Sequence, residues 1–363
     1  MPRELPLSDL HRAAGAVVEE IDGWRLPVRY GDPAAEHRAA REAVGIIDRS
    51  ALGKAVVTGR DRAAFLQGML TNDVKGLQPG QGCGAAFLDA HGKVVALLSV
   101  YALDDRLWLE LPPGLTEKTL QALDRFLISE KASFEAADDG FVVVAVQGAG
   151  ARPLLEELSG RGLELPLYAH AEAAVAGAPV RVIHRAEAGA PGFHCWTAPE
   201  HGAALWQALR TAGATPVGFE ALDVLRLEAG VPWYGRDVDE TAIMPETRLE
   251  HLVHYSKGCY IGQEVVARVK YRGHVNRALA GIMLEGDRVP RAGARVVADG
   301  KEVGRITSAA RSFALGVPIA LGYVRREHFE PGTALTVLDG ETPIPAQVVA
   351  LPFVRPASGT PSP

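Results

Sequence analysis

The chain has few cysteines, and their arrangement excludes the sites that cysteines usually build. Its 363 residues include three, Cys83, Cys195 and Cys259, which lie far apart and contain no C-x-x-C pair. We therefore expect neither a disulfide framework nor a four-cysteine metal site. The reducing cytoplasm is the location that fits this cysteine usage best.

Long apolar runs and a secretory leader are also missing. Residues 1–22 carry charges throughout and have no apolar h-region, so we expect no signal peptide. No apolar run approaches the roughly 18 residues that a spanning helix needs, so we expect no membrane partner. With 47% hydrophobic and 23% charged residues, the composition is typical of a globular protein with two or three domains.

An excess of positive charge is absent from the chain as a whole but present in one segment. The formal net charge is -6, which argues against nucleic-acid binding across the whole surface. Between residues 251 and 277, five basic residues oppose Glu264 alone, a local net charge of +4. A local contact with phosphate therefore stays open. The five basic residues are Lys257, Arg268, Lys270, Arg272 and Arg277.

The basic segment contains an eight-residue motif, K-G-C-Y-I-G-Q-E, at 257–264. A helix beginning at Gly262 or Gln263 would direct its free N–H groups toward Cys259, and nearby cations favour thiolate over thiol. The motif thus predicts a reactive sulfur beside an anionic ligand, with Cys259 and Lys257 as catalytic residues. The alternative is that Cys259 is a small buried hydrophobe and the basic residues form a solvated face.

Strand-like and helical patterns alternate without long parallel regularity, which favours an α+β fold with antiparallel sheets. We expect helices at 33–44, with Asp32 as the N-cap and Pro33 at the first position, and at 61–70, 115–128, 151–158 and 199–211. From residue 276 onward, short apolar runs separated by Gly, Pro and Asp predict a small β-barrel, and 357–363 predict a disordered tail.

The same patterns predict four regions. Residues 1–138 form an N-terminal α+β region, and 139–215 form a second α+β subdomain. Residues 216–275 complete the ligand-binding module and carry the K-G-C-Y-I-G-Q-E motif, and 276–363 form the barrel with its tail.

The motif resembles the K-G-C-[FY]-x-G-Q-E signature of the YgfZ family, folate-binding relatives of the glycine-cleavage T-protein that assist iron–sulfur enzymes. Residues 225–237, L-R-L-E-A-G followed by Y-G-x-D, are similar to a central segment of the T-protein superfamily, and 304–308 resemble a strand of its C-terminal barrel. The resemblance implies three domains around a central channel that binds tetrahydrofolate.

The resemblance also implies roles for single residues. Cys259 would act as a thiolate, and Lys257 and Arg268 would tune it or bind the negative glutamyl tail of the folate. The residues expected to hold the folate and its loop are Arg226, Glu228, Tyr260, Gln263, Glu264 and Arg268. Because Arg226 and Glu228 lie two apart, they occupy different helix faces. One would face a cavity while the other braces the scaffold, or both belong to a buried structural charge network.

Three departures from the T-protein pattern argue against glycine cleavage. Ala96 and Leu97 stand where the T-protein has an Asp-Asp pair next to folate N10, and an alkyl group cannot handle a proton. Residues 189–193 replace the Y-T-G-E folate-binding loop, and Leu222 replaces an arginine.

Three hypotheses follow. The first is a cytoplasmic folate-binding accessory protein that uses tetrahydrofolate and Cys259 to support assembly or repair of iron–sulfur clusters in client enzymes. The alternatives are a tetrahydrofolate-dependent aminomethyltransferase and an accessory factor in tRNA modification, in which direct nucleic-acid binding by this chain is not favoured. His251, His254 and His274 match no known ligand spacing with Cys259, so a transiently held cluster ranks below folate binding.

Overall fold

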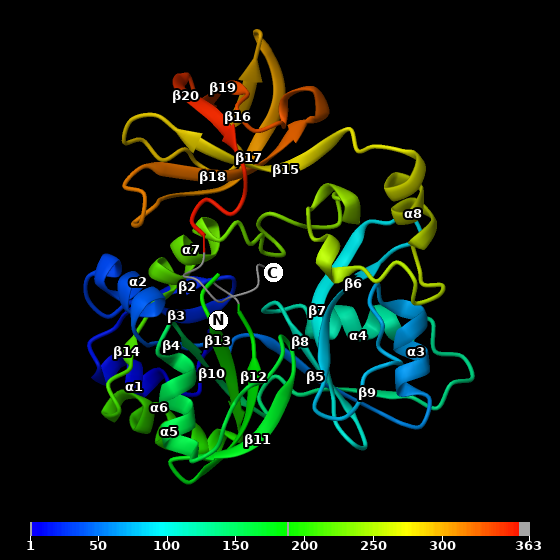
Figure 1. The fold of residues 1–363 in the computed structure, drawn as a ribbon, viewed down its shortest axis with the longest axis vertical. Helices are drawn as coiled ribbons and strands as arrows, with labels where there is room; N and C mark the ends of the chain where they lie inside the picture. The colour runs from blue at the N-terminus through cyan, green and yellow to red at the C-terminus, as the bar shows by residue number, and fades with distance from the viewer. Residues whose placement is uncertain (1, 187–188, 356–363) are drawn as a thin grey trace.

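Antiparallel strands dominate the fold, as the short apolar runs predict. The computed structural model describes residues 2–186 and 189–355, which form two large sheets, a small N-terminal sheet and a barrel (Figure 1). The predicted tail at 357–363 lies outside the described residues. The α+β class and the C-terminal barrel are confirmed.

The N-terminal lead-in forms a three-stranded sheet that the sequence pattern did not indicate. Its strand order is β1-β3-β2, and a short helix, α1 (Ser8–Ala13), connects the first two strands along the chain. Trp24 and Leu26 from this sheet pack with Leu5 and Ala51. The strands are β1 (Arg3–Glu4), β2 (Val17–Ile21) and β3 (Trp24–Arg29).

Helix α2 (Pro33–Glu42) follows the predicted capping chemistry. The Asp32 side chain accepts a hydrogen bond from the Ala34 N–H at 3.1 Å, and Pro33 occupies the first helical position. The helix ends two residues before the predicted boundary.

A six-stranded sheet has the order β11-β12-β13-β10-β4-β14. Every residue of β10 is buried, because it lies between β13 and β4 and its faces are covered. Helices α5 (Ala151–Ser159) and α6 (Pro199–Thr211) pack on the sheet with Leu155, Leu205 and Trp206. The strands are β4 (Gly45–Asp48), β10 (Val142–Gln147), β11 (His170–Val175), β12 (Ala178–His184), β13 (Gly192–Thr197) and β14 (Thr215–Pro216).

A five-stranded sheet has the order β6-β7-β8-β5-β9. Helices α3 (Arg62–Met69) and α4 (Thr116–Asp124) contribute Phe65, Leu66 and Leu120 to its core. The strands are β5 (Gly53–Thr58), β6 (Gly82–Leu88), β7 (Val94–Ala102), β8 (Leu107–Leu111) and β9 (Ser133–Ala136).

Aromatic side chains join the two large sheets. The rings of Trp108 on β8 and Trp196 on β13 stack at 5.3 Å, and Tyr101 and Phe141 pack beside them. This contact holds the cavity-facing surfaces of the sheets in a fixed relation.

The chain then crosses to the barrel through a central helix, α7 (Phe219–Glu228), two short 3-10 helices, η1 (Met244–Glu246) and η2 (Glu250–Leu252), and α8 (Gln263–Arg272). The barrel closes in the order β15-β18-β17-β16-β19-β20, and a third 3-10 helix, η3 (Arg326–His328), follows β18. Its strands are β15 (Arg277–Leu284), β16 (Arg295–Ala298), β17 (Lys301–Arg311), β18 (Pro318–Arg325), β19 (Ala334–Asp339) and β20 (Thr342–Val349).

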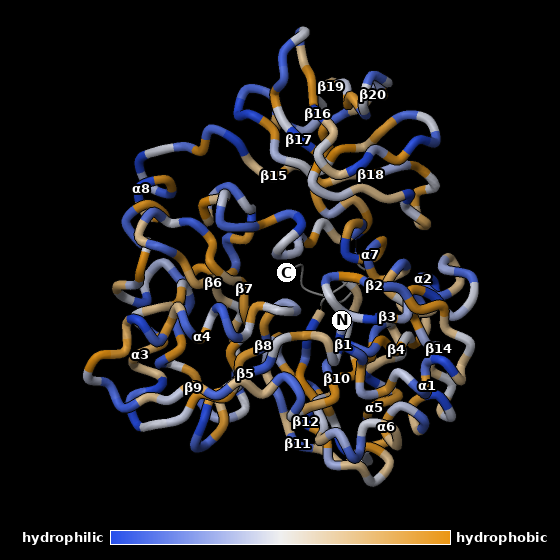
Figure 2. Tube along the Cα trace, turned by 180° about the vertical axis from the view of Figure 1, so that it is seen from behind, coloured by the Kyte–Doolittle hydropathy of each residue, from blue (hydrophilic) through white to orange (hydrophobic). Residues whose placement is uncertain are grey.

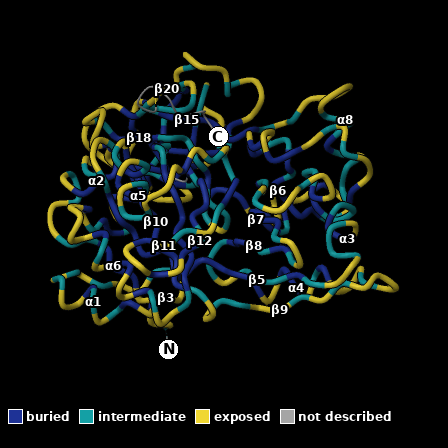
Figure 3. Tube along the Cα trace, turned by 60° about the horizontal axis from the view of Figure 1, so that its bottom comes forward, coloured by how far each residue is buried: buried dark blue, intermediate teal, exposed yellow. Residues whose placement is uncertain are grey.

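Hydropathy and burial follow the elements. Apolar stretches run along the strands (Figure 2), and the strand centres are buried while the outer turns are exposed (Figure 3). The two large sheets and the barrel each enclose a cluster of buried apolar side chains.

The predicted boundaries at 138 and 275 fall between elements, and the one at 215 falls within β14, so the four-region division stays a prediction. Within the described chain, no helix is long and apolar enough to cross a membrane.

Candidate functional site

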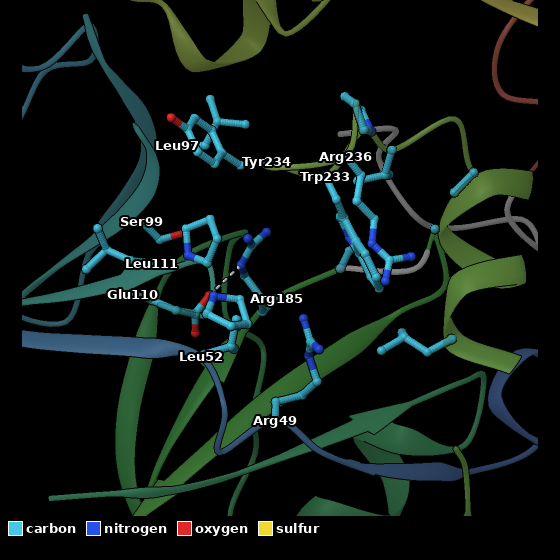
Figure 4. Close-up of a pocket in the computed structure, with 18 of the residues that line it drawn as sticks. Arg49, Leu52, Leu97, Ser99, Glu110, Leu111, Arg185, Trp233, Tyr234 and Arg236 are labelled. Carbon is cyan, nitrogen blue, oxygen red and sulfur yellow. Dashed lines mark hydrogen bonds and ion pairs between the residues drawn. The ribbon is translucent and has the colours of Figure 1, made fainter. Parts of the chain in front are cut away.

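A cavity of about 570 Å³ lies where the two large sheets, the N-terminal sheet and the barrel meet (Figure 4). Strands β7 and β8, segments 230–236 and 247–252, and Leu279 and Leu351 from the barrel side contribute to its wall. The volume is within the roughly 300–1,000 Å³ that is usual for small-molecule sites. It is therefore the candidate site of the molecule.

Strand β7 presents alternate side chains to the cavity. Leu97 and Ser99 line it, Ala96 packs in the core of the five-stranded sheet, and Leu98 packs in that core and also borders the cavity. Of the two positions at which the T-protein pattern has a carboxylate, only that of Leu97 faces the cavity. This part of the wall is therefore apolar.

Strand β8 places a buried carboxylate beside Ser99. Ser99 and Glu110 are paired across the antiparallel strands, so both side chains lie on the cavity face. Glu110 is 3% exposed and contacts Arg185 Nε at 3.1 Å and His194 Nδ1 at 2.8 Å. These contacts offset the cost of burying its charge. The Arg185 guanidinium also lies 5.3 Å from the ring centroid of Tyr168.

Trp233 and Arg236 line another part of the wall, across the cavity from Ser99 and Glu110 (Figure 4). The Trp233 ring contacts the guanidinium groups of Arg226 at 4.9 Å and Arg236 at 5.7 Å. Asp223 lies 3.4 Å from Arg236 and holds it in place. This wall offers an aromatic face and positive charge, which suit a flat ligand with an anionic group.

Unusual backbone conformations gather at the cavity. Asp22, Tyr168 and Arg248 line it and have φ of 51°, 65° and 58°. Positive φ is uncommon for residues other than glycine, and such strain persists where the surroundings enforce it. At Asp22 the conformation is that of the two-residue hairpin turn Asp22-Gly23 between β2 and β3, so the strained points of the wall are Tyr168 and Arg248.

The K-G-C-Y-I-G-Q-E motif lies outside this cavity. Cys259 is exposed, while Tyr260, Gln263 and Glu264 line a second, more open hollow beside α4 and the β6–β7 turn. Helix α8 begins at Gln263 as predicted, and Arg268 is exposed on it.

Lys257, which was predicted to tune the thiol, contacts α3. Its ammonium donates to the Gln67 carbonyl, and among the described residues no hydrogen bond joins it to Cys259. Burial lowers the pKa of Lys257 to about 8, although Asp73 and Cys83 act in the opposite direction. Burial likewise raises the pKa of Cys83 to about 12, which makes that thiol inert at neutral pH.

Gly262 serves packing within the fold. It has φ of 80°, and a Cβ there would lie 2.5 Å from the Asp89 carbonyl oxygen. The missing side chain lets α8 approach the β6–β7 turn closely.

Arg226 and Glu228 belong to buried structural networks, the second of the two alternatives. Arg226 is fully buried, contacts Asp237, and donates to Asp223 Oδ1 at 2.8 Å and Ser308 Oγ at 2.8 Å. Its partners join α7 to the following loop and to the barrel.

Glu228 connects α7 to α2 and to the loop after β17. It interacts with His37 Nε2 at 2.7 Å and Arg41 at 3.3 Å, and it accepts hydrogen bonds from Ser312 Oγ at 2.6 Å and the Ala314 N–H at 3.0 Å. Burial alone would raise the pKa of the carboxyl, but the hydrogen bonds, led by that of His37, lower it.

Within the described part of the chain, the cavity lining includes none of the eight residues that the sequence nominated, and their ligand-binding roles stay predictions. The sequence reasoning missed Glu110, Arg185 and Trp233. One signal was present: Glu110 interrupts an apolar strand, L-W-L-E-L at 107–111, and a lone charge in such a strand requires a buried partner.

Comparison with known proteins identifies relatives over the whole chain. Residues 7–257 match the model of the GCVT N-terminal domain, and residues 277–355 match that of the glycine cleavage T-protein C-terminal barrel domain. An aminomethyltransferase of Saccharopolyspora erythraea is 36% identical, with 98% of each chain covered. One of Streptomyces coelicolor is 35% identical, with 97% of this chain and 98% of the relative covered.

A solved structure agrees with these matches. The crystal structure of the glycine cleavage system aminomethyltransferase T from Bartonella henselae has a TM-score of 0.90 and 26% identity, and covers 98% of this chain and 99% of that chain. The predicted T-protein-like arrangement is therefore confirmed.

The first functional hypothesis is wrong. The near full-length relatives are named aminomethyltransferases, so the comparisons do not support an iron–sulfur accessory protein or iron–sulfur partners. The comparisons support membership of the T-protein superfamily, but they do not support membership of the YgfZ family within it. They also give no support to a role in tRNA modification. The eight-residue motif resembles one branch of the superfamily, whereas the chain as a whole is similar to aminomethyltransferases. The chain belongs to the glycine cleavage T-protein family.

Proposed function

We propose that this chain is a tetrahydrofolate-dependent aminomethyltransferase that binds its folate in the central cavity. The reaction would move the methylene carbon of a lipoyl-bound aminomethyl group to tetrahydrofolate. The carbon loses its bonds to sulfur and to the amino nitrogen and gains bonds to two folate nitrogens. Ammonia and the free dithiol leave, so no net oxidation occurs.

The observation that carries this proposal is the cavity itself. Its size fits a small molecule, and its wall combines apolar surface with an aromatic face at Trp233 and charged groups at Arg236 and Glu110. The tetrahydrofolate prediction is consistent with the family to which the chain belongs. The names of the relatives favour aminomethyl transfer over the other readings.

Leu97 supplies no proton to this reaction. We therefore expect turnover to be slow unless another group assists, since general acid–base catalysis contributes about 10²- to 10⁴-fold. The cavity otherwise retains polar groups that can orient the folate.

Cys259 lies outside the cavity wall, so we propose that folate binding does not depend on it. The cytoplasm stays the predicted location.

The test is product formation by the purified full-length chain. A lipoyl protein carrying the aminomethyl group is mixed with tetrahydrofolate, and ammonia and methylenetetrahydrofolate are measured together. We expect equal amounts of both products, dependent on the protein. Tetrahydrofolate binding without either product would contradict the transferase proposal and leave a folate-binding protein.

A further inference from the structure

Glu110 is a carboxylate in the cavity wall to which the proposed reaction assigns no role. It sits opposite Ser99 on adjacent strands, so its side chain lies on the face that lines the cavity. It is 3% exposed, and its four neighbours in β8, Leu107, Trp108, Leu109 and Leu111, are apolar. A strand with this composition would be buried at lower cost with an apolar residue at this position.

The partners of Glu110 come from the other large sheet. Arg185 follows β12 and lies 3.1 Å away through Nε (Figure 4), and His194 on β13 lies 2.8 Å away through Nδ1. His194 is completely buried. Because both of these groups belong to the part of the chain that builds the six-stranded sheet, they hold the carboxylate in place at the boundary between the two large sheets.

Stability alone does not explain a charged residue at position 110. Replacing a buried ion pair by apolar groups of similar volume is often neutral or stabilising. The aromatic contact between Trp108 and Trp196 already joins the two sheets at this level. A role in binding a ligand in the cavity accounts better for the position of Glu110.

The chemistry of a reduced folate shows which part of the ligand Glu110 would contact. The aminopyrimidine edge of the ring carries two kinds of N–H donor, the 2-amino group and N3–H, which suit a carboxylate acceptor. The glutamyl tail is anionic and would be repelled by Glu110.

We propose that Glu110 is a ligand-recognition residue that accepts hydrogen bonds from the aminopyrimidine edge of the folate ring, with Arg185 and His194 as positioning residues. This inference rests on the proposed function, since it requires a folate in the cavity. The ring then lies at the β7–β8 wall, and the tail points away from it.

The experiment separates the ring from the tail by calorimetric titration of the full-length chain. The probes are tetrahydrofolate, tetrahydropterin (the ring without the tail) and p-aminobenzoylglutamate (the tail without the ring). The proteins are the wild type, Glu110→Gln, and Glu135→Gln, a matched change of an exposed acidic residue on β9 of the same sheet that lies outside the cavity lining.

We expect Glu110→Gln to weaken binding of tetrahydrofolate and tetrahydropterin by about 10- to 100-fold, because a charge-assisted hydrogen bond is lost. Binding of p-aminobenzoylglutamate should change by less than about threefold, and Glu135→Gln should change ring affinity by less than about threefold. Unchanged ring binding by a folded Glu110→Gln protein would overturn the inference while the proposed function stands. A wild type that binds no folate would overturn both.

If Glu110→Gln does not fold, the inference is tested by changing the ligand instead of the protein. The wild type is titrated with tetrahydropterin and with its 2-desamino analogue, which lacks one donor. We expect the analogue to bind at least about tenfold more weakly. Equal affinities would overturn the inference without any variant.

Discussion

At the scale of single residues, Leu97 separates this chain from the T-protein pattern. It faces the cavity where that pattern places a carboxylate, so it is the position at which a proton-handling group can be restored. We expect Leu97→Asp to raise the rate of methylenetetrahydrofolate formation at least about tenfold, since general acid–base groups contribute about 10²-fold or more. Leu98→Asp would bury a charge in the core of the five-stranded sheet, so we expect it to unfold the protein instead.

The rate is measured by stopped reactions at saturating tetrahydrofolate. A folded Leu97→Asp protein with an unchanged or lower rate would show that this position does not limit proton transfer.

Lys54 gives a second prediction at this scale. It is fully buried, donates to the Ser50 carbonyl at 2.7 Å, and burial lowers its pKa from the ordinary 10.5 to about 8. Because the unfolded chain binds the proton more tightly, the charged lysine destabilises the fold below pH 8, and this cost disappears as the pH rises toward 10.

We therefore expect the free energy of unfolding of the wild type, relative to Lys54→Met, to increase by up to about 3 kcal/mol between pH 8 and pH 10. Urea titrations of both proteins across this range measure the difference. A difference that stays constant or falls with pH would contradict the assignment of the shift to Lys54.

The residue scale is also where sequence reasoning was weakest. The absence of an acid at Ala96 and Leu97 was readable from the pattern, but Glu110, Arg185 and His194 come from segments up to 84 positions apart. Their meeting depends on strand register and on the docking of two sheets. Neither can be read from local spacing.

At the scale of elements, the packing of α8 on the β6–β7 turn depends on Gly262. Gly262→Ala would add a Cβ 2.5 Å from a backbone oxygen in addition to the strain of φ 80°. Gly258→Ala is the matched control, because Gly258 has φ of 100° and open space around its Cβ position.

We expect Gly262→Ala to lower the free energy of unfolding by about 1–3 kcal/mol more than Gly258→Ala does. Thermal unfolding of both variants tests this. Equal losses would mean that backbone strain alone accounts for the effect and that α8 does not pack tightly.

Glu228 tests the connection between α7, α2 and the barrel. Glu228→Gln leaves His37 and Arg41 without their buried anion, so we expect a loss of about 2–4 kcal/mol at pH 7. Since the folded pKa of Glu228 is lowered, its contribution is present above the ordinary carboxyl pKa and is lost as pH falls.

The stability difference between wild type and Glu228→Gln should therefore shrink as the pH falls below the ordinary carboxyl pKa of 4.5, as measured by urea unfolding. A difference that grows on acidification would show that the carboxylate is not the stabilised form.

Most elements were predictable because their signals are local. The Asp32 cap with Pro33 marks α2, and the apolar periodicity marks α6. The N-terminal sheet was missed because β1 has two residues and the outer strand β2 has an exposed, charged pattern, so the apolar alternation is weak. Strand β11 was also missed. It is the edge strand of the six-stranded sheet and its middle residues are only partly buried, so its apolar pattern is weak as well.

At the scale of the whole molecule, the cavity exists only because the two large sheets, the N-terminal sheet and the barrel meet. The barrel was predictable from its Gly- and Pro-separated apolar runs, but its contact with the cavity through Leu279 and Leu351 was not. Such contacts depend on the path of the chain from the six-stranded sheet through α7 to the barrel. No local spacing in the sequence indicates that path. The K-G-C-Y-I-G-Q-E motif, with its exposed Cys259, lies outside this cavity.

The measurement that tests the account most directly is calorimetric titration of tetrahydrofolate into the wild type, Trp233→Ala and Cys259→Ala. We predict one site per chain, a loss of at least about tenfold in affinity for Trp233→Ala, which removes an aromatic face of the cavity, and less than about twofold change for Cys259→Ala. No binding by the wild type, or binding that depends on Cys259 and not on Trp233, would contradict the central cavity as the folate site.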